Sequence, residues 1–95
     1  MDKVESLVNY LKAYAYGKNN VVTGKTLSSY FGTTPMGIRI LVNKARYNGY
    51  AICSCKRGYY YAENKTDIQE TINQLNGRIS KIKDAISGLE KIEVM

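Results

Sequence analysis

The sequence predicts an α+β fold of three helices and a β-hairpin, followed by one long C-terminal helix. Three observations support this class. As far as Asn48, capping and turn residues separate stretches in which apolar residues recur at helical spacing. After Gly49, strand-forming residues flank a short turn. From Ile68 onward, aliphatic residues recur every three or four positions, which is typical of a helix that packs along one seam.

The first predicted helix spans residues 2–16. Asp2 can cap it, with Glu5 three residues on. Its apolar stripe consists of Val4, Leu7, Val8, Leu11 and Tyr14. Gly17 ends the helix, and Val21-Val22 can add a short strand beside the hairpin. Four tyrosines in or near this layer are expected to be half-buried core residues: Tyr10, Tyr14, Tyr16 and Tyr30.

Two helices joined by a tight turn follow. Thr23 caps the first, and Gly32 offers the left-handed residue that ends it. Thr34 caps the second, and Pro35 takes its first position, where a missing amide donor costs nothing. The predicted buried face of this second helix is Ile38, Leu41, Val42 and Ala45. The side chains left outside are Arg39, Asn43, Lys44 and Arg46. Asn48-Gly49 closes the helix.

Strand formers on both sides of Lys56-Arg57-Gly58 predict a hairpin whose turn has a basic tip. These strand formers are Tyr50, Ile52 and Tyr59 to Tyr61. Tyr60 faces the opposite side from Tyr59 and Tyr61, so at least one face of this strand is core. A helix pair followed by such a hairpin makes a winged helix-turn-helix.

Six motifs in this segment carry a family resemblance. They are Thr23-Gly24-Lys25, Gly32-Thr33-Thr34, Ile38-Arg39, Val42-Asn43-Lys44-Ala45-Arg46, Asn48-Gly49-Tyr50 and Arg57-Gly58-Tyr59-Tyr60-Tyr61. In this order they resemble the winged helix-turn-helix domain of biotin-repressor and DeoR-type regulators. They also resemble small phage and prophage proteins that join this domain to one long C-terminal helix. The resemblance implies double-stranded DNA binding and transcription regulation; replication or packaging of phage DNA is left open.

Charge is distributed unevenly along the chain. Residues 1–62 hold nine Lys or Arg against two acids, a net charge of +7, whereas residues 63–95 hold five against six, a net charge of −1. No acid lies between Glu5 and Glu63. This distribution favours a polyanionic partner, because Lys and Arg displace the counterions condensed on phosphates. The alternative is a small basic protein that its charge keeps soluble.

The candidate DNA contacts lie on the second of the paired helices and on the hairpin turn. Arg39 and Asn43 can reach base edges, while Met36 and Ile40 can touch thymine methyl groups. The other predicted contacts are Lys25, Thr33, Thr34, Lys44, Arg46, Lys56 and Arg57. The families that this segment resembles usually carry Arg, Ser, Thr or Gln directly after the cap, where this chain has Pro35-Met36-Gly37. Because this triplet offers no side-chain hydrogen bond, the second hypothesis is a protein-interaction module, a viral adaptor or inhibitor of a host protein.

The chain divides into a predicted DNA-binding domain, residues 1–63, and a dimerisation helix, residues 64–95. Thr66 with Gln69 makes a capping box at the start of this helix. Its seam consists of Ile68, Ile72, Leu75, Ile79, Ile82, Ile86 and Leu89. The heptad spacing of the seam predicts a homodimer, in which two domains engage two half-sites at once.

The mode of pairing is left open. Gly77 and Gly88 weaken the helix, so it needs a partner surface. A parallel pair would set Arg78 against the partner's Lys83, which is a like-charge contact. An antiparallel pair, or packing of the helix on its own domain, are the alternatives.

Other function classes are disfavoured. The chain has no His and no motif that pairs carboxylates, so we expect no enzyme and assign no catalytic residue. Cys53 and Cys55 share one face of a strand and are interpreted as free thiols, with a zinc site shared across a dimer as the alternative; we assign no metal or cofactor. Asp2 and Glu5 argue against a signal peptide, and no apolar run reaches the roughly 18 residues that span a bilayer, so we expect a cytoplasmic protein.

Overall fold

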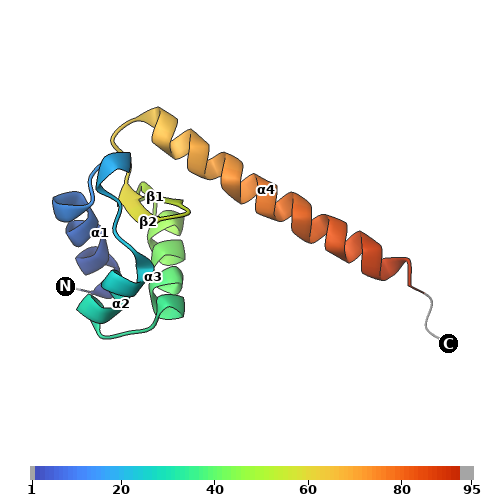
Figure 1. Ribbon diagram of the computed structural model, residues 1–95, viewed down its shortest axis with the longest axis horizontal. Helices are drawn as coiled ribbons and strands as arrows, with labels where there is room; N and C mark the ends of the chain where they lie inside the picture. Colours follow the sequence, from blue (N-terminus) through green and yellow to red (C-terminus); the bar gives the residue numbers. More distant parts are fainter. Residues whose placement is uncertain (1, 93–95) are drawn as a thin grey trace.

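The computed structural model describes residues 2–92 and shows a mixed α+β chain (Figure 1). The elements in order are α1 (Lys3–Tyr14), the 3-10 turn η1 (Lys18–Asn20), α2 (Gly24–Phe31), α3 (Pro35–Tyr47), β1 (Ile52–Cys55), β2 (Gly58–Tyr61) and α4 (Lys65–Glu90). The first three helices and the hairpin pack together, and we call this part the N-terminal unit. Its order of elements is compatible with a winged-helix layout.

The helix starts in the N-terminal unit follow from capping side chains, as predicted. The Asp2 carboxylate accepts a hydrogen bond of 2.8 Å from the amide of Glu5. Thr23 Oγ1 does the same for Thr26 at 3.0 Å, and Thr34 Oγ1 for Gly37 at 3.1 Å. Each bond satisfies an amide that has no partner within its helix. α1 ends at Tyr14, two residues before the predicted end.

The predicted capping box at the start of α4 is wrong. The cap is Asn64, whose side-chain oxygen accepts a hydrogen bond of 2.9 Å from the amide of Asp67. The Asp67 carboxylate in turn accepts one of 3.0 Å from the amide of Glu63. Thr66 already lies inside the helix, and the Gln69 amide donates to Asn73 instead. The extended backbone at Asn64 starts the helix earlier than the Thr-Gln pair suggests.

The main core is aliphatic and lies between α1, α2, α3 and β1. Its buried residues are Leu7, Val8, Leu11, Ala15, Leu27, Ile38, Val42, Ala45 and Ile52. The predicted inner face of α3 is therefore confirmed at Ile38, Val42 and Ala45, and Leu41 packs against this core from its edge. On β2, Tyr60 is buried in a second cluster with Cys53 and Ala62. Tyr59 and Tyr61 are partly buried and pack against the main core. Both faces of β2 are thus covered.

The prediction of half-buried tyrosines holds only for Tyr10. The exposed fraction is 72% for Tyr14, 46% for Tyr16 and 66% for Tyr30. Tyr10 lies between the rings of Tyr14 and Tyr30, with centroids 5.1 and 4.7 Å away. The aliphatic residues already fill the small core, so the rings of Tyr10, Tyr14 and Tyr30 contact one another in tilted pairs at its edge.

The hairpin pairs Ile52 with Tyr61 and Cys55 with Gly58, which leaves Lys56-Arg57 as the turn. The predicted strand at Val21-Val22 is reduced to one bridge, in which Val22 and Tyr59 exchange two backbone hydrogen bonds of 2.9 and 2.8 Å. Gly58 has a φ of +143°, and a Cβ atom there would collide with the backbone of Val22. A glycine is required at this crossing of chains.

We expect Gly58→Ala to lower the free energy of unfolding by about 2–3 kcal/mol, because it adds both backbone strain and this collision. Gly77→Ala is the matched control. Gly77 lies in α4 with open space around the position of a Cβ atom, so the same change should raise helix stability by about 1 kcal/mol. Urea unfolding of both variants checks the pair, and equal effects of the same sign would contradict the assignment.

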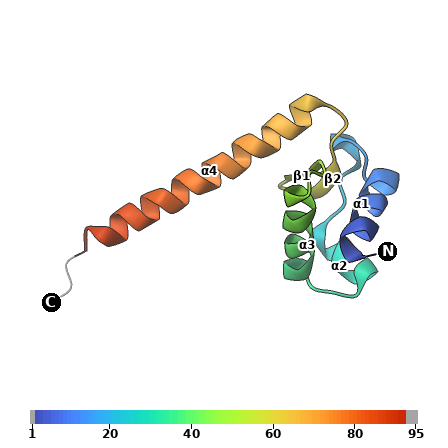
Figure 2. The same cartoon turned by 180° about the vertical axis from the view of Figure 1, so that it is seen from behind.

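α4 contacts the N-terminal unit only near its own start. Asp67 and Thr71 are buried against the hairpin, and Leu75 is half-buried. Every described residue from Asn76 to Ile92 is exposed. Seen from both sides, the far part of α4 projects away from the rest of the chain (Figure 1 and Figure 2). The alternative, packing of the helix on its own domain, therefore holds for the first turns of α4 and is wrong for residues 76–92.

Candidate nucleic-acid interface

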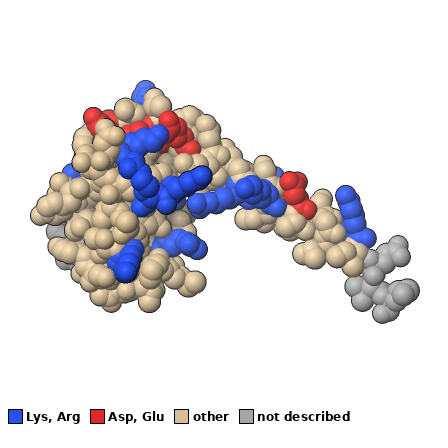
Figure 3. Space-filling view, viewed as in Figure 1, with Lys and Arg blue, Asp and Glu red and all other residues tan. Residues whose placement is uncertain are grey.

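A hollow of about 760 Å³ lies between α3, the hairpin turn and α4. Its cationic lining residues are Arg39, Arg46, Lys56, Arg57 and Arg78, with Asn43 beside them. Among residues 2–92, no Asp or Glu lines the hollow. Figure 3 shows Lys and Arg side chains gathered between the N-terminal unit and α4 and continuing along α4. A concave surface with charges of one sign concentrates a positive potential, which attracts anions.

The structure brings some of the predicted contacts together in this hollow and leaves others outside it. Arg39, Asn43 and Arg46 come from α3, and Lys56 and Arg57 come from the hairpin turn. The predicted contacts outside the hollow are Lys25, Thr33, Thr34, Met36, Ile40 and Lys44. Of these, only Thr33 is not largely exposed. The candidate interface is therefore wider than the hollow and includes the outward face of α3.

The turn before α3 explains one unusual residue of that helix. A Cβ atom at Gly37 would collide with the side chain of Thr33. Thr34 Oγ1 is already engaged as the helix cap. In this chain, therefore, Thr33 and Thr34 shape the start of α3, and Gly37 leaves the space that this turn needs.

The prediction that the Arg46 side chain lies outside is wrong. The residue is half-buried. Its Nε donates a hydrogen bond of 2.9 Å to the carbonyl of Ile52, and Nη2 donates one of 3.1 Å to Ser54 Oγ. Burial lowers the pKa of Arg46, and the charge of nearby Arg78 lowers it further. Sequence spacing placed Arg46 on the polar side of α3. The hairpin covers that side, and its strand β1 accepts the hydrogen bonds of the guanidinium.

Arg46→Ala is expected to lower the free energy of unfolding by about 1–2 kcal/mol, because it leaves the Ile52 carbonyl and the Ser54 hydroxyl without this donor. Arg39→Ala, an exposed change on the same helix, should leave stability within about 0.5 kcal/mol of the wild type. Urea or thermal unfolding of the two variants checks the difference. If both were equally stable, Arg46 would not be the residue that ties α3 to β1.

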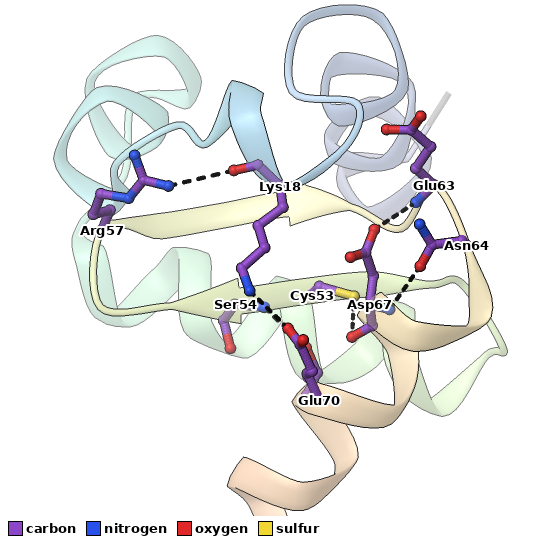
Figure 4. A network of polar contacts seen from close by, with 9 residues as sticks. Lys18, Cys53, Ser54, Arg57, Glu63, Asn64, Asp67 and Glu70 are labelled. Atoms are coloured by element: carbon purple, nitrogen blue, oxygen red, sulfur yellow. Dashed lines mark hydrogen bonds and ion pairs between the residues drawn. The ribbon is translucent and has the colours of Figure 1, made fainter.

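A polar network fixes the direction in which α4 leaves the N-terminal unit (Figure 4). The thiol of Cys53 donates to the carbonyl of Asp67 at 3.4 Å, and the amide of Ser54 donates to Thr71 Oγ1 at 3.4 Å. Burial raises the pKa of Cys53, which keeps the thiol protonated as a donor. Burial also raises the pKa of Tyr60 to about 12. The first two turns of α4 are thereby held against β1.

Lys18 joins the hairpin turn to α4 from the other side. Its Nζ forms an ion pair of 2.8 Å with Glu70 on α4, and its carbonyl accepts a hydrogen bond of 3.4 Å from Arg57 (Figure 4). The hydrogen bond to Glu70 raises the pKa of Lys18. The pair is exposed, so its contribution to stability is small. The hydrogen bond to the Lys18 carbonyl holds the guanidinium of Arg57 beside η1, and Arg57 also lines the hollow.

The aliphatic seam of α4 is open to solvent. The exposed fraction is 38% for Ile68, 42% for Ile72, 49% for Ile79, 59% for Ile82, 49% for Ile86 and 69% for Leu89. The start of the seam also borders a second, smaller groove of about 200 Å³. Its apolar lining residues are Ile68, Ile72 and Leu75 of α4 and Tyr50, Ala51, Ile52 and Cys53 of the N-terminal unit, and Arg46 and Thr71 also line it. The exposed seam of α4 thus begins at a groove that it shares with β1.

Arg78 is the residue that sequence reasoning missed at this site. Its heptad position suggested only a flank of the seam, but it lines the hollow opposite α3. A signal was present, because Arg78, Lys81 and Lys83 lie in a stretch of α4 that has no acid between Glu70 and Asp84. The two acids nearer the start of the helix already have partners. Asp67 accepts a hydrogen bond from the amide of Glu63, and Glu70 pairs with Lys18.

Residues 2–92 contain no cluster of three His, Cys, Asp or Glu side chains with the geometry of a metal site. Within the same part of the chain, none of the helices combines the length and the apolar character that crossing a membrane requires. Neither a scan against protein-family models nor searches of curated proteins and of solved structures found a match to the chain.

Proposed function

We propose that this chain binds double-stranded DNA as a homodimer, through a winged helix-turn-helix formed by its N-terminal unit, and that it regulates transcription in a phage or mobile element. The observation that carries the proposal is the acid-free cationic hollow where the outward side of α3 meets the hairpin turn. The major groove of B-DNA is wide enough to admit a helix such as α3, and phosphates flank that groove on both sides.

The roles of individual side chains follow from their positions. Arg39 and Asn43 are exposed on α3 beside the hollow, where they can meet the edges of guanine and adenine. Lys44 is exposed next to them and suits a phosphate contact. Lys56 and Arg57 on the hairpin turn suit the backbone beside the groove. Arg46 supports this surface by holding α3 to β1 and is reassigned from direct contact to positioning.

The homodimer is supported by the open seam of α4. An isolated helix of this kind, with Gly77 and Gly88 in its interior, is marginal in water, and two seams can cover each other. The seam repeats at heptad spacing over most of the helix, as in coiled coils. Joining two weak sites raises the overall affinity through effective concentration.

The experiment that tests the proposal is binding of the purified chain to a random-sequence duplex pool at 50 and 200 mM salt, with sequencing of the bound fraction. Enrichment of a repeated, palindromic site supports a specific dimeric regulator. Salt-sensitive binding without enrichment supports a protein that reads the backbone, and it overturns the regulatory role while keeping DNA as partner. Absence of binding at both salts overturns the proposal.

A second function, a protein-interaction module, is favoured by one observation. Met36, Ile40 and Tyr47 are 67%, 50% and 92% exposed and lie on one face of α3 with Asn43. Three large apolar side chains on one exposed helix face suit a protein partner as well as thymine methyl groups. If Met36→Ala and Ile40→Ala leave DNA binding unchanged while Arg39→Ala/Lys44→Ala weakens it, this apolar face does not contact DNA and is open to a protein partner.

A further inference from the structure

We propose that α4 is a third wall of the DNA site, and that Arg78 contacts the DNA backbone from this helix. The proposal rests on the DNA-binding function above and assigns α4 a role besides dimerisation. Arg78 lines the same hollow as Arg39 and Asn43 of α3 and as Lys56 and Arg57 of the hairpin turn. A duplex seated on α3 would therefore have cationic groups on three sides.

The position of Arg78 is set by the fold. Asp67 and Thr71 anchor the start of α4 on β1, and Arg78 lies two to three turns beyond them on the same side of the helix. Figure 3 shows cationic side chains continuing from the N-terminal unit onto α4. The rigid attachment means that Arg78 reaches the hollow without any rearrangement.

The electrostatics of the hollow indicate what it accepts. Arg78 lies close enough to Arg46 for its charge to lower the pKa of that residue. Arg46 has a separate reason to be there, since it bonds Ile52 and Ser54. No acidic side chain of the described part of the chain lines the hollow to offset these charges. A phosphate oxygen between these walls would relieve the repulsion, and guanidinium groups match phosphate geometry well.

A parallel dimer does not explain Arg78. In a parallel pair of α4 helices it would face the partner's Lys83, and that contact is repulsive. The aliphatic seam covers itself without help from this position. Arg78 is exposed, so it also contributes little to the core of its own chain.

The test compares three single variants of the full chain on a 30-base-pair duplex over a salt series: Arg78→Ala, Arg78→Lys and Lys91→Ala. Lys91 is exposed at the end of α4, away from the hollow, and its variant removes the same charge. We expect Arg78→Ala to weaken binding about fivefold at 50 mM salt and to lower the salt slope by about one per subunit. Arg78→Lys should keep the slope, and Lys91→Ala should match the wild type.

The outcomes separate this inference from the function on which it rests. If Arg78→Ala has the same affinity and slope as Lys91→Ala while Arg39→Ala weakens binding, α4 is not part of the site and the DNA-binding proposal stands. If the wild type does not bind the duplex, the proposed function itself fails. Light scattering on the same samples records the oligomeric state, and a weaker affinity that merely follows dissociation of Arg78→Ala into monomers overturns the inference.

Discussion

Ile79→Asp is expected to convert the proposed homodimer into a monomer and to weaken DNA binding about 100-fold. Ile79 lies at the centre of the α4 seam and is 49% exposed in the single chain. In the dimer, a carboxylate there would lose its hydration between apolar side chains. The loss of affinity follows because two linked sites bind with a high effective concentration, and a monomer has only one site. Light scattering and a duplex-binding titration measure the two effects.

The matched control for this change is Ser80→Asp. Ser80 follows Ile79 directly, is exposed and does not belong to the seam. The variant therefore adds the same charge outside the pairing face. We expect it to leave the dimer intact and to change affinity less than threefold. A wild-type chain that is monomeric, or an Ile79→Asp variant that stays dimeric, would show that the seam serves another purpose. Circular dichroism should also show less helix in Ile79→Asp, because an unpaired α4 frays.

The double variant Arg39→Ala/Lys44→Ala is expected to bind duplex DNA about 100-fold more weakly than the wild type. Both side chains are exposed on α3, so the change leaves the core intact. In a dimer it removes four cationic contacts, and the salt slope should fall by at least one per subunit. Fluorescence anisotropy at several salt concentrations gives both quantities.

A comparison with Lys3→Ala/Lys91→Ala decides whether position or total charge matters. This control also removes two positive charges, but from exposed sites that lie neither in the hollow nor on α3. If DNA is held at the interface described here, the control should lose less than threefold. Equal losses in both variants would favour a small basic protein that attracts DNA only through its net charge.

Most local structure in the N-terminal unit was predictable because short-range physics decides it. Asp2, Thr23 and Thr34 cap their helices through hydrogen bonds that span three residues. Gly32 ends α2 in the left-handed conformation, with a φ of +63°. The apolar face of α3 follows from helical spacing alone. For the same reason, exposure of Arg39, Asn43 and Lys44 could be predicted.

The errors lie where residues distant in the chain meet. Arg46 has the spacing of a surface residue, yet the hairpin closes over it and accepts its hydrogen bonds. Tyr14 and Tyr30 look like core residues, yet the aliphatic side chains had already filled the small interior. Asn64 is a residue type that caps helices, so a local signal was present. The Thr66-Gln69 pair matches the capping-box pattern and was therefore chosen as the helix start.

The sequence by itself determined the order of the elements, the inner face of α3, the concentration of positive charge in the first 62 residues and the heptad seam. These properties follow from composition, from the spacing of apolar residues or from contacts between residues that are close in the chain. Only the tertiary structure decided that α4 projects from β1 with its seam open and that Arg78 shares a hollow with α3 and the hairpin turn. The direction of α4 depends on contacts such as that of Cys53 with Asp67 and that of Ser54 with Thr71, which join residues 14 and 17 positions apart.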